Sequence, residues 1–225
     1  MRQRKFPAVL AVIGIILFEL YMNVFPVNSG ALPKCFPTGE MFPYKDAQGN
    51  IKYDSVYHTI ADFKLTDQNG STFTNDALKN KVYVADFFFV SCPTICPRMT
   101  KSMLNLQRTF LNDTSVAFLS HTISPEHDSV AVLKRYEAKN KINGRQWHIL
   151  TGPRKDLYDL SKRSYYLGVR NDSPDNFQHS EKFVLVDDHR IIRGYYDGTD
   201  SLEVDRLQSD IKTLLKEIKS KPINN

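Results

Sequence analysis

Two nearly unbroken apolar runs in the middle of the chain predict a buried sheet. Residues 82–90 and 116–123 contain few polar positions, which is typical of strands that are covered on both faces. Residues 147–150 form a shorter run of the same kind. Apolar residues recur with helical spacing in three stretches between and after these strands: 93–109, 126–140 and 157–167. Strands that alternate with helices predict a parallel sheet core.

Two hairpins and a helix complete the predicted domain. Residues 60–66 and 71–74 flank an Asn-Gly pair, which is the strongest short signal for a hairpin turn. Residues 182–187 and 191–196 predict a second hairpin near the end of the chain. A final amphipathic helix is predicted to begin after Asp200, which would cap it, and a glutamate three residues later would complete a capping box.

A long apolar segment near the start predicts a membrane anchor. Residues 6–27 are apolar apart from Glu19 and Asn23, and about 20 such residues span a bilayer as a helix. Basic residues precede the segment, which would keep that end in the cytoplasm and place the rest of the chain outside. We expect residues 1–27 to be an uncleaved anchor, with a single N-terminal span in a bacterial inner membrane. A cleaved signal peptide is the alternative.

Composition is consistent with one domain carried on a linker. The chain has 225 residues, of which 41% are hydrophobic and 24% charged. Residues 28–55 contain several prolines and glycines and predict a tether, so the domain is expected over 56–225. The formal net charge of +5 is spread along the chain rather than gathered in one block, so we expect no nucleic-acid partner.

A pair of cysteines directly after the first buried strand is the strongest chemical signal. The stretch is Cys92-Pro93-Thr94-Ile95-Cys96. Positions four residues apart lie on one face of a helix, close enough to share a metal ion or to form a disulfide after local adjustment. A helix N-terminus favours the thiolate, the form that binds soft metals and attacks disulfides. In the oxidising compartment outside the membrane, such a pair indicates metal binding or redox cycling.

A strand that leads into a dithiol at a helix start, followed by a closing hairpin and helix, predicts a thioredoxin-like fold. We expect an α/β domain with a mixed central sheet flanked by helices and preceded by a β-hairpin. Thioredoxins have two residues between their cysteines, whereas Cys92 and Cys96 are separated by three. Peroxiredoxins carry a threonine three residues before the reactive cysteine, where this chain has Phe89.

Residues 86–99 closely resemble the corresponding stretch of the Sco/SenC family of thioredoxin-fold copper proteins. Residues 124–128 stand where that family has an Asp-Pro-Glu-x-Asp turn, although Ser124 replaces the first aspartate. Gln178-His179-Ser180 stands at the family's copper-binding histidine. The resemblance implies copper bound by Cys92, Cys96 and His179. It also implies assembly of the CuA site of cytochrome c oxidase. The implied partners are the CuA-bearing subunit and other periplasmic copper chaperones or thiol reductants.

The residue types agree with copper chemistry. Two thiolates suit Cu(I), an imidazole also suits Cu(II), and a structural zinc site would need a fourth ligand. If His179 is not the third ligand, His127 is the next candidate. We expect the other polarisable or nucleophilic side chains to lie outside the site: His58, His121, His148, His189, Met99, Met103 and the lone thiol Cys35.

Three functions follow from such a site. A copper metallochaperone would deliver the bound ion to the oxidase. A thiol-disulfide oxidoreductase would instead reduce the cysteines of the oxidase copper site, and a redox or copper sensor would signal through the state of its disulfide. The dithiol serves all three, whereas only copper binding requires His179.

Overall fold

The computed structural model describes residues 31–46, 48–168, 170–171, 177–178 and 180–220. Within these ranges, no helix is both long and apolar enough to cross a membrane. The predicted anchor over residues 6–27 lies outside them. Leu32–Asn225 form one compact unit, and the described part of this unit carries the sheet, the helices and the cysteine pair.

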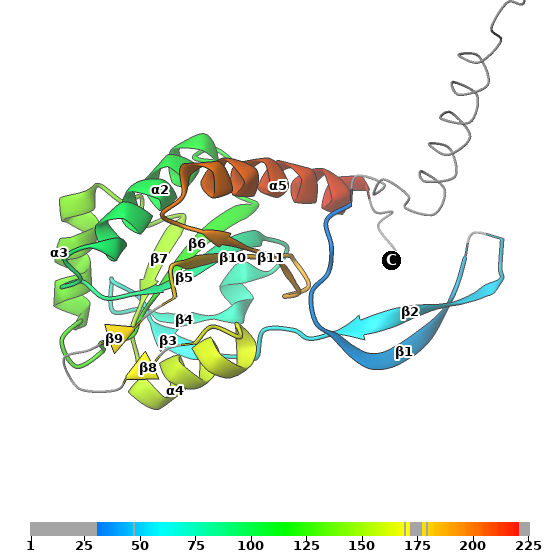
Figure 1. The fold of residues 1–225 in the computed structure, drawn as a ribbon, viewed down its shortest axis with the longest axis horizontal. Helices are drawn as coiled ribbons and strands as arrows, with labels where there is room; N and C mark the ends of the chain where they lie inside the picture. The colour runs from blue at the N-terminus through cyan, green and yellow to red at the C-terminus, as the bar shows by residue number, and fades with distance from the viewer. Residues whose placement is uncertain (1–30, 47, 169, 172–176, 179, 221–225) are drawn as a thin grey trace, which may run out of the picture. The chain divides into compact units, whose positions relative to one another are not determined.

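A five-stranded mixed sheet forms the centre of the domain, with strand order β11-β10-β5-β6-β7 (Figure 1). Strands β5, β6 and β7 run parallel to one another, as the alternation of strands and helices predicted. The last two strands form an antiparallel hairpin, and its first strand pairs antiparallel with β5. The strands are β5 (Val82–Phe88), β6 (Val116–Thr122), β7 (Trp147–Leu150), β10 (Lys182–Val186) and β11 (Ile192–Asp197).

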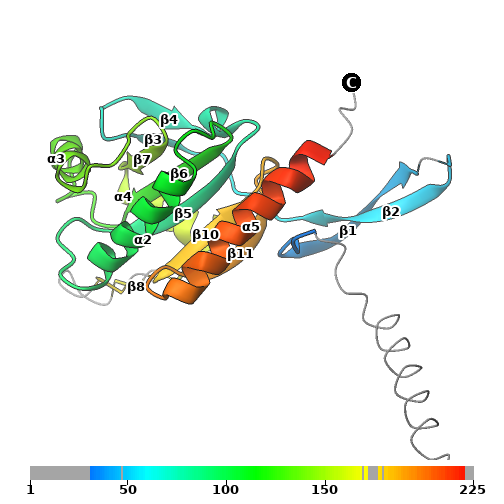
Figure 2. The same cartoon turned by 90° about the horizontal axis from the view of Figure 1, so that it is seen from above.

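Side chains of β5 alternate between two buried clusters on opposite faces of the sheet. Val82, Val84 and Phe88 belong to the cluster that also contains the inner faces of α2 (Ile95–Thr109) and α5 (Ser201–Ser220). Figure 2 shows these two helices side by side above the sheet. The intervening residues of β5 face the second cluster, to which two short helical segments contribute: α4 (Arg154–Asp159) and the π-helical turn Leu160–Ser164.

The helices next to the predicted site begin later than their apolar spacing indicated. Helix α2 begins at Ile95 rather than residue 93, with Thr94 as its N-cap. Helix α3 (Val130–Asn140) begins four residues later than predicted, because residues 124–128 form a turn in which two backbone N–H groups donate to the Ser124 carbonyl.

The last helix confirms half of the predicted capping box. Asp200 Oδ1 accepts the Leu202 N–H at 2.9 Å, so Asp200 caps α5. The Asp200 N–H donates to the Asp197 carbonyl, and Glu203 pairs with Arg206 instead. The Asp200 N–H, which Glu203 would accept in a full capping box, is therefore satisfied by the Asp197 carbonyl.

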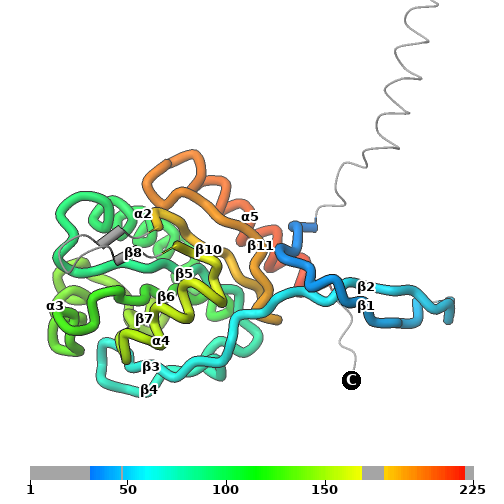
Figure 3. Tube along the Cα trace, turned by 60° about the horizontal axis from the view of Figure 1, so that its bottom comes forward, coloured from blue at the N-terminus to red at the C-terminus, as the bar shows by residue number. Residues whose placement is uncertain are grey.

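Within the described residues, three small antiparallel ladders lie outside the main sheet. The predicted first hairpin is confirmed as β3 (Lys64–Thr66) with β4 (Thr72–Thr74), followed by a 3₁₀ turn at Asn75–Leu78. A further hairpin, β1 (Pro37–Lys45) with β2 (Ile51–Tyr57), occupies much of the segment that was expected to be a tether (Figure 3). The third ladder joins β8 (Arg170–Asn171) to β9 (Phe177–Gln178).

Candidate metal centre

The cysteine pair lies at the carboxyl end of β5, where the chain turns into α2. The Cys92 N–H donates to the Phe89 carbonyl at 3.2 Å and closes a tight turn after the strand. Cys96 lies in the first turn of α2. Both cysteines belong to the buried cluster on the α2 side of the sheet, and their exposed fractions are 8% for Cys92 and 2% for Cys96.

The two cysteines form no disulfide, and a hydrogen bond from the backbone of Cys96 to the sulfur of Cys92 links them instead. The Cys96 N–H donates to the Cys92 sulfur at 3.4 Å. Because the N-cap residue Thr94 makes no side-chain capping bond, the Cys92 sulfur serves as an acceptor for the N-terminal turn of α2. An N–H that points at sulfur from a helix N-terminus interacts more strongly with a thiolate than with a thiol.

Burial raises the pKa of the Cys96 thiol well above its ordinary value. A hydrogen bond from the Phe89 backbone opposes this shift, while Cys92 and the carboxyl group of Asp86 add to it. Cys96 therefore keeps its proton at neutral pH, and a metal ion that binds its sulfur must displace that proton.

Three side chains hold α2 against α3 beside the dithiol. The Tyr136 hydroxyl and Thr100 Oγ1 are hydrogen-bonded at 2.6 Å, and Thr100 also donates to the Cys96 carbonyl at 2.8 Å. The Tyr136 ring packs on Phe88 with 5.4 Å between ring centroids. Burial raises the pKa of Tyr136, and the nearby Asp86 and both thiols add to the shift, so its hydroxyl stays protonated.

The loop between β6 and α3 is fastened to the backbone just ahead of Cys92. The buried carboxylate of Asp128 accepts the Val90 N–H at 3.2 Å and the Thr122 hydroxyl at 2.5 Å. His127, the alternative third ligand, bonds Ser124 Oγ through its Nδ1 at 3.1 Å. The aspartate that the resemblance placed at the end of this turn therefore has a structural role.

His179 lies outside the described residues, so its role as a ligand stays a prediction. The backbone on either side of it is described. Gln178 ends β9, and β10 begins three residues after His179 and pairs with β5 in a register that sets Val184 opposite Ala85. Since this pairing is antiparallel, the chain ahead of β10 runs past the carboxyl end of β5, where the dithiol lies.

Three other histidines make contacts away from the dithiol. His121 is fully buried on the opposite face of the sheet, stacked on Phe87 at 4.8 Å, and bonds the Asp86 carbonyl through Nδ1. His58 bonds the Ser164 carbonyl, and His148 packs on Phe73. The two methionines of α2 are confirmed as core residues: Met99 and Met103 are fully buried.

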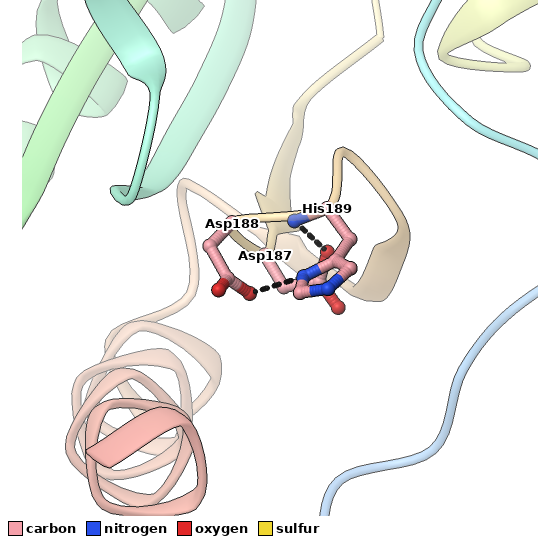
Figure 4. Close-up of side chains that lie close together, drawn as sticks. All are labelled: Asp187, Asp188 and His189. Carbon is pink, nitrogen blue, oxygen red and sulfur yellow. Dashed lines mark hydrogen bonds and ion pairs between the residues drawn. The ribbon is translucent and has the colours of Figure 1, made fainter. Parts of the chain in front are cut away.

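His189 belongs to a turn that gathers two carboxylates and an imidazole (Figure 4). Asp187 Oδ1 accepts the N–H groups of His189 and Ile191, and Oδ2 accepts Arg193 at 3.1 Å. Asp188 accepts the His189 ring at 2.9 Å. The Asp187 oxygens are thus engaged in closing the β10–β11 hairpin, so the cluster is explained by the turn.

Cys35 lies away from the dithiol. Its N–H donates to the Ile192 carbonyl, and its half-buried side chain packs on the second cluster, across the sheet from Cys92 and Cys96. Burial raises the pKa of this thiol, and the charge of Arg193 partly offsets the shift. The segment expected as a free tether is therefore docked on β11 at this point.

Comparisons with known proteins agree with this arrangement. The SCO1 protein homolog of Bacillus subtilis is 28% identical over 163 residues, covering 71% of this chain and 84% of its own length. The structure of BsSco, described as a member of the Sco family of cytochrome c oxidase assembly proteins with a disulfide switch, matches with a TM-score of 0.64 at 28% identity. It covers 75% of this chain and 98% of its own.

A second structure shares the fold. The copper-bound ScoI of Bradyrhizobium japonicum matches with a TM-score of 0.59 at 22% identity, over 69% of this chain and 99% of its own. The family model described as SCO1/SenC matches residues 52–216, which is most of the chain and includes the dithiol, the loop before α3, β11 and most of α5. The chain belongs to the SCO1/SenC family.

Proposed function

We propose that this chain is a copper metallochaperone that binds one copper ion through Cys92, Cys96 and His179. It would deliver the ion to the CuA-bearing subunit of cytochrome c oxidase. The proposal rests mainly on two buried thiols four residues apart at the carboxyl end of β5, the end from which β10 begins its antiparallel pairing with β5. The similarity to BsSco, a member of the Sco family of cytochrome c oxidase assembly proteins, and to ScoI, whose structure has copper bound, supports it.

The ligand set suits an ion that is handed on. Thiolates are soft donors that favour Cu(I), and the imidazole extends the site to Cu(II). Three protein ligands leave room for a donor atom of the receiving protein. Cys96 keeps its proton until copper arrives, since burial raises its pKa, so each binding event releases that proton and each release takes one up.

The proposed place of action is the outer face of a bacterial inner membrane. Residues 6–27 would anchor the chain, and the basic residues before them would stay in the cytoplasm. The copper domain would then face the same compartment as the CuA site, other copper chaperones and thiol reductants.

His179→Ala is the decisive variant. We expect it to weaken Cu(II) binding by about tenfold or more, because the hardest donor is removed, and to weaken Cu(I) binding less, because both thiolates remain. Titration with each ion, monitored by thiolate-to-copper absorption, measures both effects. The matched control is His189→Ala, which removes an exposed histidine from a turn whose contacts are accounted for.

Equal Cu(II) affinity and absorption in His179→Ala and the unmodified chain would remove His179 from the site. His127→Ala would then be tested next, since its ring lies on the loop fastened to Val90.

A thiol-disulfide oxidoreductase is the second candidate, favoured by the difference between the two thiols. The Cys92 thiolate would attack a target disulfide, and a mixed disulfide would form as one target thiolate leaves. Cys96, after losing its proton, would displace the second target thiol and form the Cys92–Cys96 disulfide, so the target gains the two electrons that the pair loses. A Cys96→Ser variant that accumulates no mixed disulfide with an oxidised CuA-domain target would exclude this activity.

A further inference from the structure

The β1–β2 hairpin carries most of the exposed apolar surface of the described domain. Among its described residues, nine large apolar side chains are exposed, and five of them lie on this hairpin. They are Met41, Phe42, Tyr44, Ile51 and Tyr53. Every residue of β1 is exposed. Contiguous exposed apolar surface of this kind marks a contact with a protein or a membrane.

Strand register separates the two faces of the hairpin. Residues directly opposite each other in an antiparallel pair project from the same face. Met41 pairs with Ser55, Pro43 with Tyr53, and Lys45 with Ile51. Met41, Pro43, Ile51 and Tyr53 therefore share one face, which we call the apolar face. Its three large side chains are each more than 60% exposed: Met41 62%, Ile51 64% and Tyr53 63%.

The opposite face alternates aromatic and charged side chains. Phe42 pairs with Asp54, and Tyr44 pairs with Lys52. A two-stranded hairpin with one open apolar face is marginal in water, so a covering surface would stabilise it. The apolar face, which has Lys45 near the turn as its only charged side chain within the paired register, is the surface to be covered.

Pairing of the β1 edge with a second copy is opposed by Pro43. The Asp46 N–H donates to the Asn50 carbonyl, so these two residues form a hydrogen-bonded pair. Because hydrogen-bonded and non-hydrogen-bonded pairs alternate, the Tyr44–Lys52 pair is also hydrogen-bonded. Pro43 and Tyr53 then form a non-hydrogen-bonded pair, whose backbone groups point away from the partner strand. A proline at this position removes the outward donor and blunts the edge.

A buried arginine holds the segment that precedes the hairpin, a few residues along the chain from the predicted anchor. Arg193 is 1% exposed and donates to the carbonyls of Leu32 at 2.5 Å and Pro33 at 3.0 Å while pairing with Glu217 at 2.8 Å. Four residues lie between Leu32 and the end of the apolar segment at Val27, which corresponds to at most about 18 Å of extended chain from one to the other. Strand β1, with nine residues, is itself about 30 Å long.

We propose that the apolar face of the β1–β2 hairpin lies in the interfacial layer of the lipid bilayer. The inference rests on the membrane anchor of the proposed function for proximity, and on the hairpin itself for chemistry. Tyr53 suits the headgroup level, Met41 and Ile51 suit the acyl boundary, and Lys45 on the same face can extend its amine to lipid phosphates. Two attachments, anchor and hairpin, would hold the dithiol at a defined height above the membrane.

Tryptophan fluorescence in brominated lipid tests the contact. The chain has one tryptophan, Trp147, and it is 1% exposed within the core. The full chain carrying Tyr53→Trp is reconstituted into vesicles of phosphatidylcholine with a minor fraction of phosphatidylglycerol, with plain or brominated acyl chains. Bromine quenches indoles only at contact distance, so we expect the added emission to fall by about half or more in brominated vesicles.

The matched control is Leu202→Trp, at an apolar position 76% exposed at the start of α5. Its emission should be unchanged by bromine. Met41→Ser with Ile51→Ser in the Tyr53→Trp chain should lower the quenching, because the apolar area that holds the face in lipid is reduced.

Each outcome decides between the proposals. If the protein floats with the vesicles but Tyr53→Trp is quenched no more than Leu202→Trp, the lipid contact is overturned and the anchor stands. The hairpin would then face a protein. A chain that does not float with vesicles overturns both the anchor and the lipid contact. Copper titration of the same samples reports on the metal site separately, so its failure leaves the hairpin result standing.

Discussion

Burial adds to the difference between the two cysteines that their order along the chain predicts, since Cys92 lies nearer the helix N-terminus. Cys92 accepts the Cys96 N–H, and burial raises the pKa of the Cys96 thiol. We expect Cys92 to react with iodoacetamide at least about tenfold faster than Cys96 at pH 8, because the thiolate is the nucleophile and Cys96 is both protonated and 2% exposed. Timed alkylation with mass spectrometry measures both rates, with Cys92→Ser and Cys96→Ser chains as controls. Faster labelling of Cys96 would reverse the assignment.

His121 makes the free energy of unfolding depend on pH. Complete burial lowers its pKa from 6.5 to about 4, with the bond to the Asp86 carbonyl opposing the shift. Between pH 6.5 and about pH 4, the His121 ring is therefore protonated in the unfolded chain and neutral in the folded chain. The stability that the neutral ring contributes is present above pH 6.5 and is lost as the pH falls through about 4. A shift of this size corresponds to about 3 kcal/mol.

Urea titrations at pH 7 and pH 4.5 measure this dependence. The unmodified chain should lose more stability between the two pH values than His121→Gln, whose amide can still donate to Asp86 but does not titrate. Carboxylates that titrate in the same window contribute to both chains, so the difference isolates His121. Parallel pH slopes in the two chains would contradict the assigned cause.

At the level of elements, Arg193 joins three parts of the chain that are distant in sequence. Its guanidinium, on β11, pairs with Asp187 before the hairpin turn and with Glu217 on α5, and it donates to the carbonyls of Leu32 and Pro33. Arg193→Met leaves two carboxylates and two carbonyls short of donors in a buried place. We expect it to lower the free energy of unfolding by about 3–5 kcal/mol, as for other broken buried pairs.

Arg190→Met is the matched control for this prediction. Arg190 lies three residues earlier and pairs with Asp62, whose side chain is 90% exposed. An exposed pair of this kind contributes about 1 kcal/mol or less. Chemical denaturation of the two variants should therefore give clearly different losses. A loss of similar size in both would mean that Arg193 acts through surface charge rather than through the buried contacts.

The strands and helix interiors were predictable from the sequence because each carries its own periodicity. The strand over 147–150 was placed to the residue, and the parallel order followed from alternating strands and helices. Helix starts were misplaced where a tertiary contact decides them. Before Val130, the Asp128 carboxylate accepts the Val90 N–H and fixes the loop. Before Ile95, the Cys92 N–H donates to the Phe89 carbonyl and closes a turn. Neither contact is indicated by a sequence motif.

The site was predictable only in its most local part. Cys92 and Cys96 could be found from their spacing and from the strand before them. Two of the side chains around them come from a different part of the chain, and sequence spacing does not report such contacts. Tyr136 and Asp128 were therefore missed as neighbours of the dithiol. The β1–β2 hairpin was missed because its prolines and glycines favoured a linker.

At the scale of the whole molecule, the fold has a core that does not depend on the proposed copper site. The sheet is covered on both faces by clusters of buried apolar residues, and the dithiol lies within only one of them. We expect the copper-free, reduced protein to keep its secondary structure and its buried Trp147, unlike a zinc finger that unfolds without metal. Copper should add stability only by mass action, about 2.7 kcal/mol at a hundred times the dissociation constant.

Circular dichroism and Trp147 emission, measured before and after chelation, test whether the fold survives the loss of copper. Cys92→Ser, which lacks one of the two thiolates, is the control. The chelated protein and the Cys92→Ser chain should give the same helix and sheet signal and unfold cooperatively at similar urea concentrations. Loss of most of the circular dichroism on chelation would make copper a structural ion. That result would be hard to reconcile with delivery, because a chaperone that unfolds on release would have to refold before each new ion.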